Sequence, residues 1–534
     1  MSKRTNGPRA GRAWLFALCL AASLASAQWA APVTADAAPL GGGGAEAAVA
    51  SPGRLPALGE AQVWSLGREQ RLGERLMAAL YRQQAVREDA VMQDYLAAIW
   101  GPLFDSARRS GLLTPAMADR FAWPLLIIQD ASVNAFAMPG GVVGVHLGLL
   151  AATETPAQVA AVLAHELSHV SQRHMARLIE RQNQVSPLAI GAAMLALLAA
   201  GDGAASGDAA QAVFVGSQAA LAQSGINFTR DMEREADRIG QRIFDGAGFP
   251  SQAFGEMFTR LYEASRLNDD GSFPYLRTHP LTRERLAEVM ARDSGRLADV
   301  GPGPVPEVWA TLMRARAQVM QTTRREDWQD WWLATPDATV TAPGMAYRAA
   351  LAAERLGEYE DAWRRLQHLA QRDWPQPVQA LWRAERLRLW AVAPKPLAEP
   401  ATVKAWVAEG LEDPARAVWL NASRLAVRWP DLQSKASARL QAWLVAHAGD
   451  APAWSALMQL REAQGQQLRA LRAQAEAALA RGQLDGALDV LQAAQEWSRA
   501  HPREDPVEAQ VIWARERALR EQQRAWAQAE REDG

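Results

Sequence analysis

The chain has 534 residues and a formal net charge of −2, with 57 Lys and Arg against 59 Asp and Glu. This length exceeds what one hydrophobic core usually organises, so we expect two or more domains. The balanced charge, without a Lys/Arg tract, excludes the electrostatic footprint of a nucleic-acid-binding protein. Apolar residues make up 49% of the chain, which favours packed helices over disorder for most of its length.

The first 27 residues have the pattern of an export signal. Four basic residues precede an apolar run at 13–24, and the small residues Ala25-Ser26-Ala27 follow it. This order is typical of a secretory signal cleaved after Ala27, and the run is shorter than the ~20 residues of a membrane span. The one cysteine, Cys19, lies inside this signal, so the mature chain would have neither disulfide nor thiol nucleophile. Export without disulfides fits a bacterial periplasm, which is the location we expect.

The next stretch leads from a leader into a small sheet. Residues 28–58 are mostly Ala, Gly and Pro, and we expect a flexible leader because they cannot bury enough apolar surface. Helical spacing of apolar residues predicts two or three helices between 60 and 108. The run 123–128 predicts a strand, and 133–145 predicts a hairpin with Pro139-Gly140-Gly141 at its turn.

The predicted hairpin has two interpretations that the sequence leaves open. It could pack entirely in the core, or one free strand edge could hold an extended peptide through backbone hydrogen bonds. In the second case the candidate substrate-binding residues are Asn134, Phe136, Gly140 and Gly141.

The stretch with the most specific chemistry is His165-Glu166-Leu167-Ser168-His169, inside a helix that we expect to span about 156–182. A helix turns 100° per residue, so His165 and His169 lie about 40° apart on one face. Two neutral imidazoles at this separation can bind one Zn²⁺ ion. Glu166 projects beside them and could take a proton from water without being a ligand itself.

Two apolar runs, 188–200 and 209–221, follow this helix and are separated by Gly201-Asp202-Gly203. Neither run is long enough to span a bilayer. We expect a helical hairpin or lid near the active site, with contact to a membrane surface as the alternative.

A second chemical stretch runs from Asp231 to Gly240. Glu233 and Asp237 are four residues apart and share a helix face, whereas Glu235 projects from the opposite side. This geometry predicts Glu233 as the third zinc ligand. It also places Asp237 to accept a hydrogen bond from the outer nitrogen of a zinc-bound His. The alternative is a charged helix in solvent.

Two further histidines are candidates for the site. On a continuing helix His174 would face away from His165 and His169, so we interpret it as structural. His279 precedes Pro280, which disfavours a helix there, so we expect a loop before a helix at 282–291. His279 could be a fourth ligand that closes the site, a donor to the transition-state oxyanion, or neither.

The composition changes from about residue 305. Sixteen of the 21 Trp lie beyond residue 300, and two segments, 357–375 and 482–502, align with each other. Both have Gly at a helix–helix turn, Ala where paired helices approach closely and a later Pro, which is the tetratricopeptide pattern. We therefore expect a helical repeat domain over 305–534 that binds a partner. An all-α bundle without a binding groove is the alternative.

These motifs together resemble a known family. His165-Glu166-x-x-His169 with Glu233-x-x-x-Asp237 is similar to the gluzincin metallopeptidases of the CAAX-prenyl-protease and HtpX type. The segments 134–141, 173–174 and 235–238 are similar to the family's exported branch, which carries tetratricopeptide repeats. The resemblance implies a mainly α fold, with an α+β zincin-type peptidase domain and its small sheet at 59–300, followed by an α-solenoid.

The resemblance also implies roles for residues and partners. It makes His165, His169 and Glu233 the ligands of one Zn²⁺ ion per chain and Glu166 the base, and it matches His279 to a His that caps the metal in a latent form. It implies a periplasmic endopeptidase that acts on outer-membrane β-barrel proteins as they assemble and degrades stalled ones. The repeat domain would contact the assembly machinery, with at most peripheral membrane contact. The alternative is a chaperone or adaptor with a latent or vestigial zinc site, acting through its repeat domain.

Overall fold

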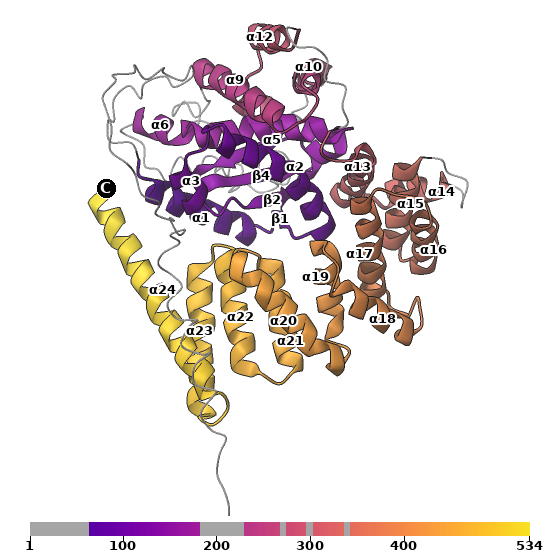
Figure 1. Ribbon diagram of the computed structural model, residues 1–534, viewed down its shortest axis with the longest axis vertical. Coiled ribbons are helices and arrows are strands. Elements are labelled where there is room, and N and C mark those ends of the chain that lie inside the picture. Colours follow the sequence, from indigo (N-terminus) through magenta and orange to yellow (C-terminus); the bar gives the residue numbers. More distant parts are fainter. Residues whose placement is uncertain (1–63, 182–228, 268–273, 295–302, 336–341, 534) are drawn as a thin grey trace, which may run out of the picture. The chain divides into compact units, whose positions relative to one another are not determined.

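The structure is a computed structural model that describes residues 64–181, 229–267, 274–294, 303–335 and 342–533 (Figure 1). The predicted export signal, the predicted leader at 28–58 and the apolar runs between 188 and 221 lie outside these residues. In the part of the chain that is described, no helix combines the length and apolar character needed to cross a membrane.

A four-stranded sheet forms the β part of the fold. Its strands are β1 (Val86–Arg87), β2 (Leu125–Ile128), β3 (Ala135–Met138) and β4 (Val142–His146), in the order β1-β2-β4-β3. β2 pairs parallel with β4, and β3 pairs antiparallel with β4 in the register Met138↔Val142. The predicted strand and hairpin are therefore both present, and β3 is an edge strand.

The described chain has ten helices between residues 64 and 294. They are α1 (Leu66–Arg82), α2 (Ala90–Arg109), α3 (Pro115–Arg120), α4 (Leu147–Ala152), α5 (Pro156–Ser171), α6 (His174–Arg181), α9 (Arg230–Gly246), α10 (Gln252–Leu267), α11 (Tyr275–Thr278) and α12 (Arg283–Ser294). α5 is the central one, because it contacts β3, α2, α9 and α10.

The expected helix 156–182 was wrong in its extent. It begins as expected, with Thr155 as N-cap and Pro156 in the first turn, but it ends at Ser171. Arg173 then adopts a left-handed backbone conformation with φ of +54°, and α6 starts at His174. The Arg173 side chain is hydrogen-bonded to the buried Glu69 of α1 through Nε and Oε1 at 2.7 Å. This hydrogen bond joins residues that are 104 positions apart in the sequence. Local residue spacing therefore gives no sign of the break in the helix.

The described residues from 303 onward are all helical or connecting. Their helices are α13 (Glu307–Gln321), α14 (Arg325–Leu333), α15 (Pro343–Leu356), α16 (Tyr359–Ala370), α17 (Gln376–Val392), α18 (Pro400–Gly410), α19 (Arg416–Ala426), α20 (Pro430–Ala446), α21 (Ala451–Ala463), α22 (Gln467–Ala480), α23 (Leu484–Ala500) and α24 (Pro506–Asp533). Most of them contact the next helix in the chain, as paired helices do. The predicted fold class, a small α+β part followed by a helical region, is confirmed.

The two segments that align in the sequence have the same turn in the structure. Gly357 ends α15 with φ of +92°, and Gly482 follows α22 with φ of +73°. In each turn the next residue's N–H reaches a carbonyl five residues back at 2.9 Å, from Glu358 to Ala353 and from Gln483 to Ala478. A left-handed residue at such a helix end favours glycine. The assignment to tetratricopeptide repeats stays a prediction.

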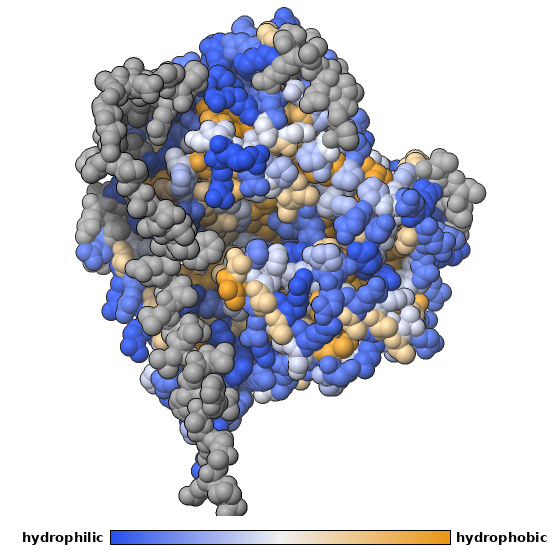
Figure 2. All heavy atoms as spheres, viewed as in Figure 1, coloured by the Kyte–Doolittle hydropathy of each residue, from blue (hydrophilic) through white to orange (hydrophobic). Residues whose placement is uncertain are grey.

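The helical region shares its hydrophobic core with the residues before it. One cluster of buried side chains runs from Val91 to Ala473, and Ala61–Gly534 forms one compact unit. On the face shown in Figure 2, polar side chains cover most of the described surface, with smaller apolar patches between them. The predicted domain division near residue 300 stays a prediction.

Candidate metal centre

Two helices supply the centre of the site, α5 and α9. They can approach closely because α9 presents Ala236 and Gly240 to α5. A Cβ on Gly240 would lie 3.1 Å from the His165 backbone, so a side chain there would push the helices apart. The Ser168 hydroxyl adds a hydrogen bond of 3.0 Å to the Ala236 carbonyl. Small residues at this crossing therefore set the distance between the histidines of α5 and the carboxylates of α9.

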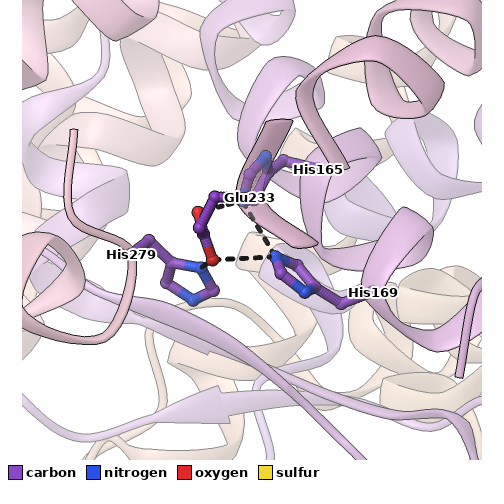
Figure 3. A group of neighbouring side chains, drawn as sticks. All are labelled: His165, His169, Glu233 and His279. Atoms are coloured by element: carbon purple, nitrogen blue, oxygen red, sulfur yellow. Dashed lines mark hydrogen bonds and ion pairs between the residues drawn. The ribbon is translucent and has the colours of Figure 1, made fainter. Parts of the chain in front are cut away.

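Four side chains converge between these helices and the segment before α12 (Figure 3). They are His165, His169, Glu233 and His279, whose potential ligand atoms all lie within 4.8 Å of one another. The two Nε2 atoms of His165 and His169 are 3.0 Å apart. Glu233 lies 3.5 Å from each of these rings, through Oε2 to His165 and Oε1 to His169. The structure thus brings together every residue that the sequence predicts as a ligand, and His279 with them.

These distances fit a metal ion. A tetrahedral zinc ion with bonds of about 2.1 Å keeps its ligand atoms roughly 3.4 Å apart. The donor set of two imidazoles and a carboxylate is one that zinc prefers. All four side chains are at most 3% exposed.

The contacts within the cluster shift the pKa of His165 and of Glu233 in opposite directions. Burial lowers the pKa of the His165 imidazole, but its hydrogen bonds with Asp237 and Glu233 outweigh burial and raise that pKa to about 9. Burial raises the pKa of Glu233, but the His279 ring and the hydrogen bond with His165 hold it well below its usual value. Without a metal ion, these contacts therefore favour the protonated form of His165 and the ionised form of Glu233.

Asp237 lies where its sequence position predicts. Its Oδ1 is 3.2 Å from His165 Nδ1, the nitrogen that points away from the cluster. A carboxylate only accepts, so in the neutral ring that a metal requires the His165 proton belongs on Nδ1 and the Nε2 lone pair faces the cluster. Burial raises the pKa of Asp237, but the hydrogen bonds from Arg285 and His165 outweigh it and keep the carboxyl ionised.

Glu166 is a fully buried carboxylate beside the cluster. Both of its oxygens are buried without a hydrogen-bond partner among the described residues. His279 Nε2 is 3.6 Å from its Oε1. Burial raises the pKa of the Glu166 carboxyl, although the His279 and His165 rings lower it. A buried carboxylate with a raised pKa next to the ligand cluster has the properties of a general base.

His279 follows α11 and precedes α12, in the connection that the sequence predicts. Its Nδ1 is 3.0 Å from Glu233 Oε1, and its ring stacks on Tyr275 at 4.7 Å between centroids. Its place within the cluster is compatible with a fourth ligand. Its Nε2 also faces Glu166, so the role of an oxyanion donor stays open.

The candidate substrate-binding residues lie on the hairpin beside α5. Asn134 and Phe136 are buried, and the Phe136 ring packs on Gly144, where an added Cβ would lie 2.1 Å from it. Gly140 and Gly141 have φ of +76° and +79° and form the turn between β3 and β4. Their close contacts are with Gln70 of α1 and with Trp123. The structure gives these residues positions in the core and the turn, and their role in substrate binding stays a prediction.

Three residues near the centre escaped the sequence interpretation. Arg285 of α12 pairs with both Asp237 and Glu233, the latter through Nη1 and Oε2 at 2.9 Å. His174, expected to face away, lies 2.9 Å from His169 between the two Nδ1 atoms. The other ring nitrogen of His174 is 3.1 Å from Glu235 Oε2. No spacing in the sequence could have found these contacts, because each depends on a turn or a packing between distant segments.

Comparison with known proteins gives a family for this part of the chain. Residues 112–293 match the sequence profile of Peptidase family M48. Over these residues the chain is similar to the peptidases of this family. The matched segment contains all four cluster residues, Glu166 and the Arg285 of α12. Members of this family are metallopeptidases, so a metal cofactor is expected for the cluster.

Individual relatives match a similar part of the chain. The β-barrel assembly-enhancing protease of Escherichia coli is 36% identical over 185 residues, which are 34% of this chain and 36% of the relative. The protein of the same name from Yersinia pestis is 35% identical over 185 residues, with the same coverage. The mitochondrial metalloendopeptidase OMA1 of Schizosaccharomyces pombe is 32% identical over 167 residues, 31% of this chain and 45% of the relative. The similarity thus covers less than half of each relative.

Proposed function

We propose that the protein is a zinc-dependent endopeptidase. The observation that carries this proposal is the convergence of His165 Nε2, His169 Nε2 and the Glu233 carboxylate within 3.5 Å of one another, beside the buried Glu166. The match of residues 112–293 to Peptidase family M48 supports it.

The side chains divide the chemistry among themselves. A bound zinc ion would polarise the scissile carbonyl and make water more acidic. Glu166 would take the proton from the attacking water and return it to the leaving amine. Asp237 holds the His165 ring, so that its lone pair stays directed at the cluster. His279 would either close the site as a fourth ligand or donate a hydrogen bond to the oxyanion.

The substrates that we propose are outer-membrane β-barrel proteins in the periplasm, with stalled ones degraded. Support comes from the predicted export signal at 1–27 and from the names of the bacterial relatives. The edge strand β3 beside α5 suits an extended chain held by its backbone. The helical region would contact the assembly machinery.

The test compares the wild-type chain with Glu166→Gln. Both should bind one zinc ion per chain, because Glu166 is not a ligand. Only the wild type should cleave an unfolded β-barrel protein, with a loss of about 10²-fold or more in the variant. Chelation should abolish the wild-type activity and zinc should restore it. Glu154→Gln is the control. It should keep full activity, because Glu154 forms an exposed ion pair with Arg260. Cleavage at the wild-type rate by Glu166→Gln would refute the proposal.

A second candidate is a chaperone or adaptor with a closed zinc site. The observation in its favour is His279, which lies inside the buried cluster at 3.0 Å from Glu233. The comparison that separates the candidates is rescue of an outer-membrane assembly defect by the full-length chain carrying Glu166→Gln. Rescue equal to the wild type favours the adaptor, and loss of rescue favours the peptidase.

A further inference from the structure

A chain of hydrogen bonds leads away from His169 on the side opposite the cluster. His169 Nδ1 is 2.9 Å from His174 Nδ1. His174 Nε2 is 3.1 Å from Glu235 Oε2, and the same oxygen is 3.0 Å from Nη1 of Arg177. His174 is fully buried. The first two contacts join α5 to α9 through one imidazole at the start of α6.

The identities of these atoms decide which nitrogen of each ring holds a proton. The Glu235 carboxylate can only accept, so a neutral His174 carries its proton on Nε2 and offers a lone pair at Nδ1. His169 must then be the donor in the contact between the two Nδ1 atoms. With its proton on Nδ1, His169 has a lone pair on Nε2. That atom is the one that faces His165 and Glu233 at 3.0 and 3.5 Å.

The opposite arrangement would disable His169 as a ligand. If His174 donated from Nδ1, a neutral His169 would carry its proton on Nε2, inside the cluster. A protonated ring nitrogen cannot bind a metal ion, because ligation needs its lone pair. Glu235 therefore selects the binding tautomer of His169 through His174.

The two metal-side histidines are thus oriented by two carboxylates of the same helix. Asp237 accepts directly from His165 Nδ1 at 3.2 Å. Glu235 projects from the opposite side of α9 and acts through the inserted ring of His174. The left-handed turn at Arg173 makes this insertion possible, because it returns the chain toward His169 after α5 has ended.

We infer that His174 is a positioning residue which, together with Glu235, holds His169 in its metal-binding tautomer and orientation. The inference rests on the proposed zinc site and extends it to two residues outside the ligand set. It predicts a metal-binding defect that depends on the hydrogen-bond acceptor at position 174, and not on the mere packing of α6.

The experiment measures zinc affinity in the full-length chain by competition with a chromophoric chelator. His174→Ala should bind zinc about 10- to 100-fold more weakly, the range seen when the partner of a ligating His is removed. In His174→Asn the side-chain carbonyl can replace the Nδ1 acceptor, and the affinity should return to within about threefold of the wild type. Glu235→Gln replaces the carboxylate, which can only accept, but leaves the His174 ring in place. We expect a loss of zinc affinity between that of His174→Asn and that of His174→Ala.

Arg177→Gln is the matched control. It breaks the other contact to Glu235 from the same helix, α6, but leaves the His174 ring untouched, so zinc affinity should stay within about threefold of the wild type. The absorption spectrum of the cobalt-substituted chain adds a readout of ligand geometry, which should change in His174→Ala and recover in His174→Asn. This spectrum does not depend on catalysis.

Each result bears on the inference separately from the proposed function. If the wild type binds zinc and His174→Ala binds it equally well, the inference is overturned while the zinc site stands. The same holds if His174→Asn is as defective as His174→Ala, because the acceptor would then be irrelevant. If the wild type itself binds no zinc, the proposed function fails, and the inference fails with it.

Discussion

The Arg285 guanidinium forms two parallel hydrogen bonds with the Asp237 carboxylate, Nε to Oδ2 and Nη2 to Oδ1, each of 2.8 Å. Both side chains are at most 2% exposed. A third nitrogen, Nη1, pairs with Glu233 at 2.9 Å. One arginine from α12 therefore balances two buried carboxylates of α9, one of them a predicted zinc ligand.

Replacement of Arg285 by Leu should destabilise the chain strongly. It would leave Asp237 and Glu233 buried without this cation, and removal of one partner of a buried pair costs about 3–5 kcal/mol. Urea unfolding of the metal-free chain measures the loss. Arg234→Gln is the control, because its pair with Glu288 is nearly half exposed on both sides and such pairs contribute about 0–1 kcal/mol. Equal effects of the two substitutions would contradict the assigned role of Arg285.

Replacement of His279 by Ala should raise the basal rate of proteolysis. Its Nδ1 lies 3.0 Å from Glu233 within the cluster, and a fourth ligand would occupy the position that a substrate carbonyl or water needs. Cleavage of an unfolded β-barrel protein, measured beside the zinc content, checks this. Lower activity with zinc retained would contradict the latch and favour an oxyanion donor.

The ligand pair of α5 was accessible to sequence reasoning because it depends on one helix and one period. His165 and His169 need only α-helical geometry to share a face, and the same holds for Glu233 and Asp237. The chemistry of the motif predicted that α5 and α9 lie together, since zinc needs a third ligand. Their contact is set by the small residues Ala236 and Gly240.

The remaining parts of the site depend on tertiary contacts that no local pattern contains. The turn at Arg173 contains neither Gly nor Pro, so helical spacing predicted that the helix continues through it. On such a helix His174 would face away from His169, whereas in the structure the two rings are in contact. The buried contact with Glu69, far along the chain, accompanies the turn. The sequence analysis did not single out Arg285, because the approach of α12 to α9 that buries it is a tertiary contact.

Asp94 of α2 gives the chain a pH-dependent stability. Burial raises the pKa of this carboxyl to about 6, although the N–H of Ala417, 2.9 Å away, lowers it. The folded chain therefore holds the proton more tightly than the unfolded chain, whose pKa is near 3.8. The stability that this group contributes is fully present below the unfolded pKa, and it is lost as the pH rises through about 6.

Asp94→Asn should accordingly stabilise the chain at neutral pH. The amide oxygen can still accept from Ala417, and the charge that burial disfavours is gone. We expect a gain of roughly 1–3 kcal/mol near pH 7, since one pKa unit is worth about 1.4 kcal/mol, and almost none near pH 4. Chemical unfolding at both pH values tests this, with the exposed Asp105→Asn of the same helix as control. A gain that is equal at both pH values would contradict the assignment to Asp94.

Arg316 of α13 should be required for the stability of residues on both sides of position 300. It is 4% exposed, and its Nη2 and Nε bind Asp89, which caps the start of α2. Its Nη1 is hydrogen-bonded to Tyr347 at 2.6 Å and to Glu385 at 2.9 Å. Arg316→Leu would remove this cation from the partly buried Asp89 and the fully buried Glu385, at a cost of about 3–5 kcal/mol.

The way in which Arg316→Leu unfolds would also test the predicted division near residue 300. Because one hydrophobic core runs from Val91 to Ala473, we expect a single calorimetric transition in the wild type that moves as a whole to lower temperature in the variant. Arg324→Gln, at the start of α14 and in an exposed pair with Glu326, should leave it in place. Two transitions, of which only one shifts, would instead mean that the peptidase part and the helical region unfold independently, and that the charge cluster at Arg316 belongs to one of them.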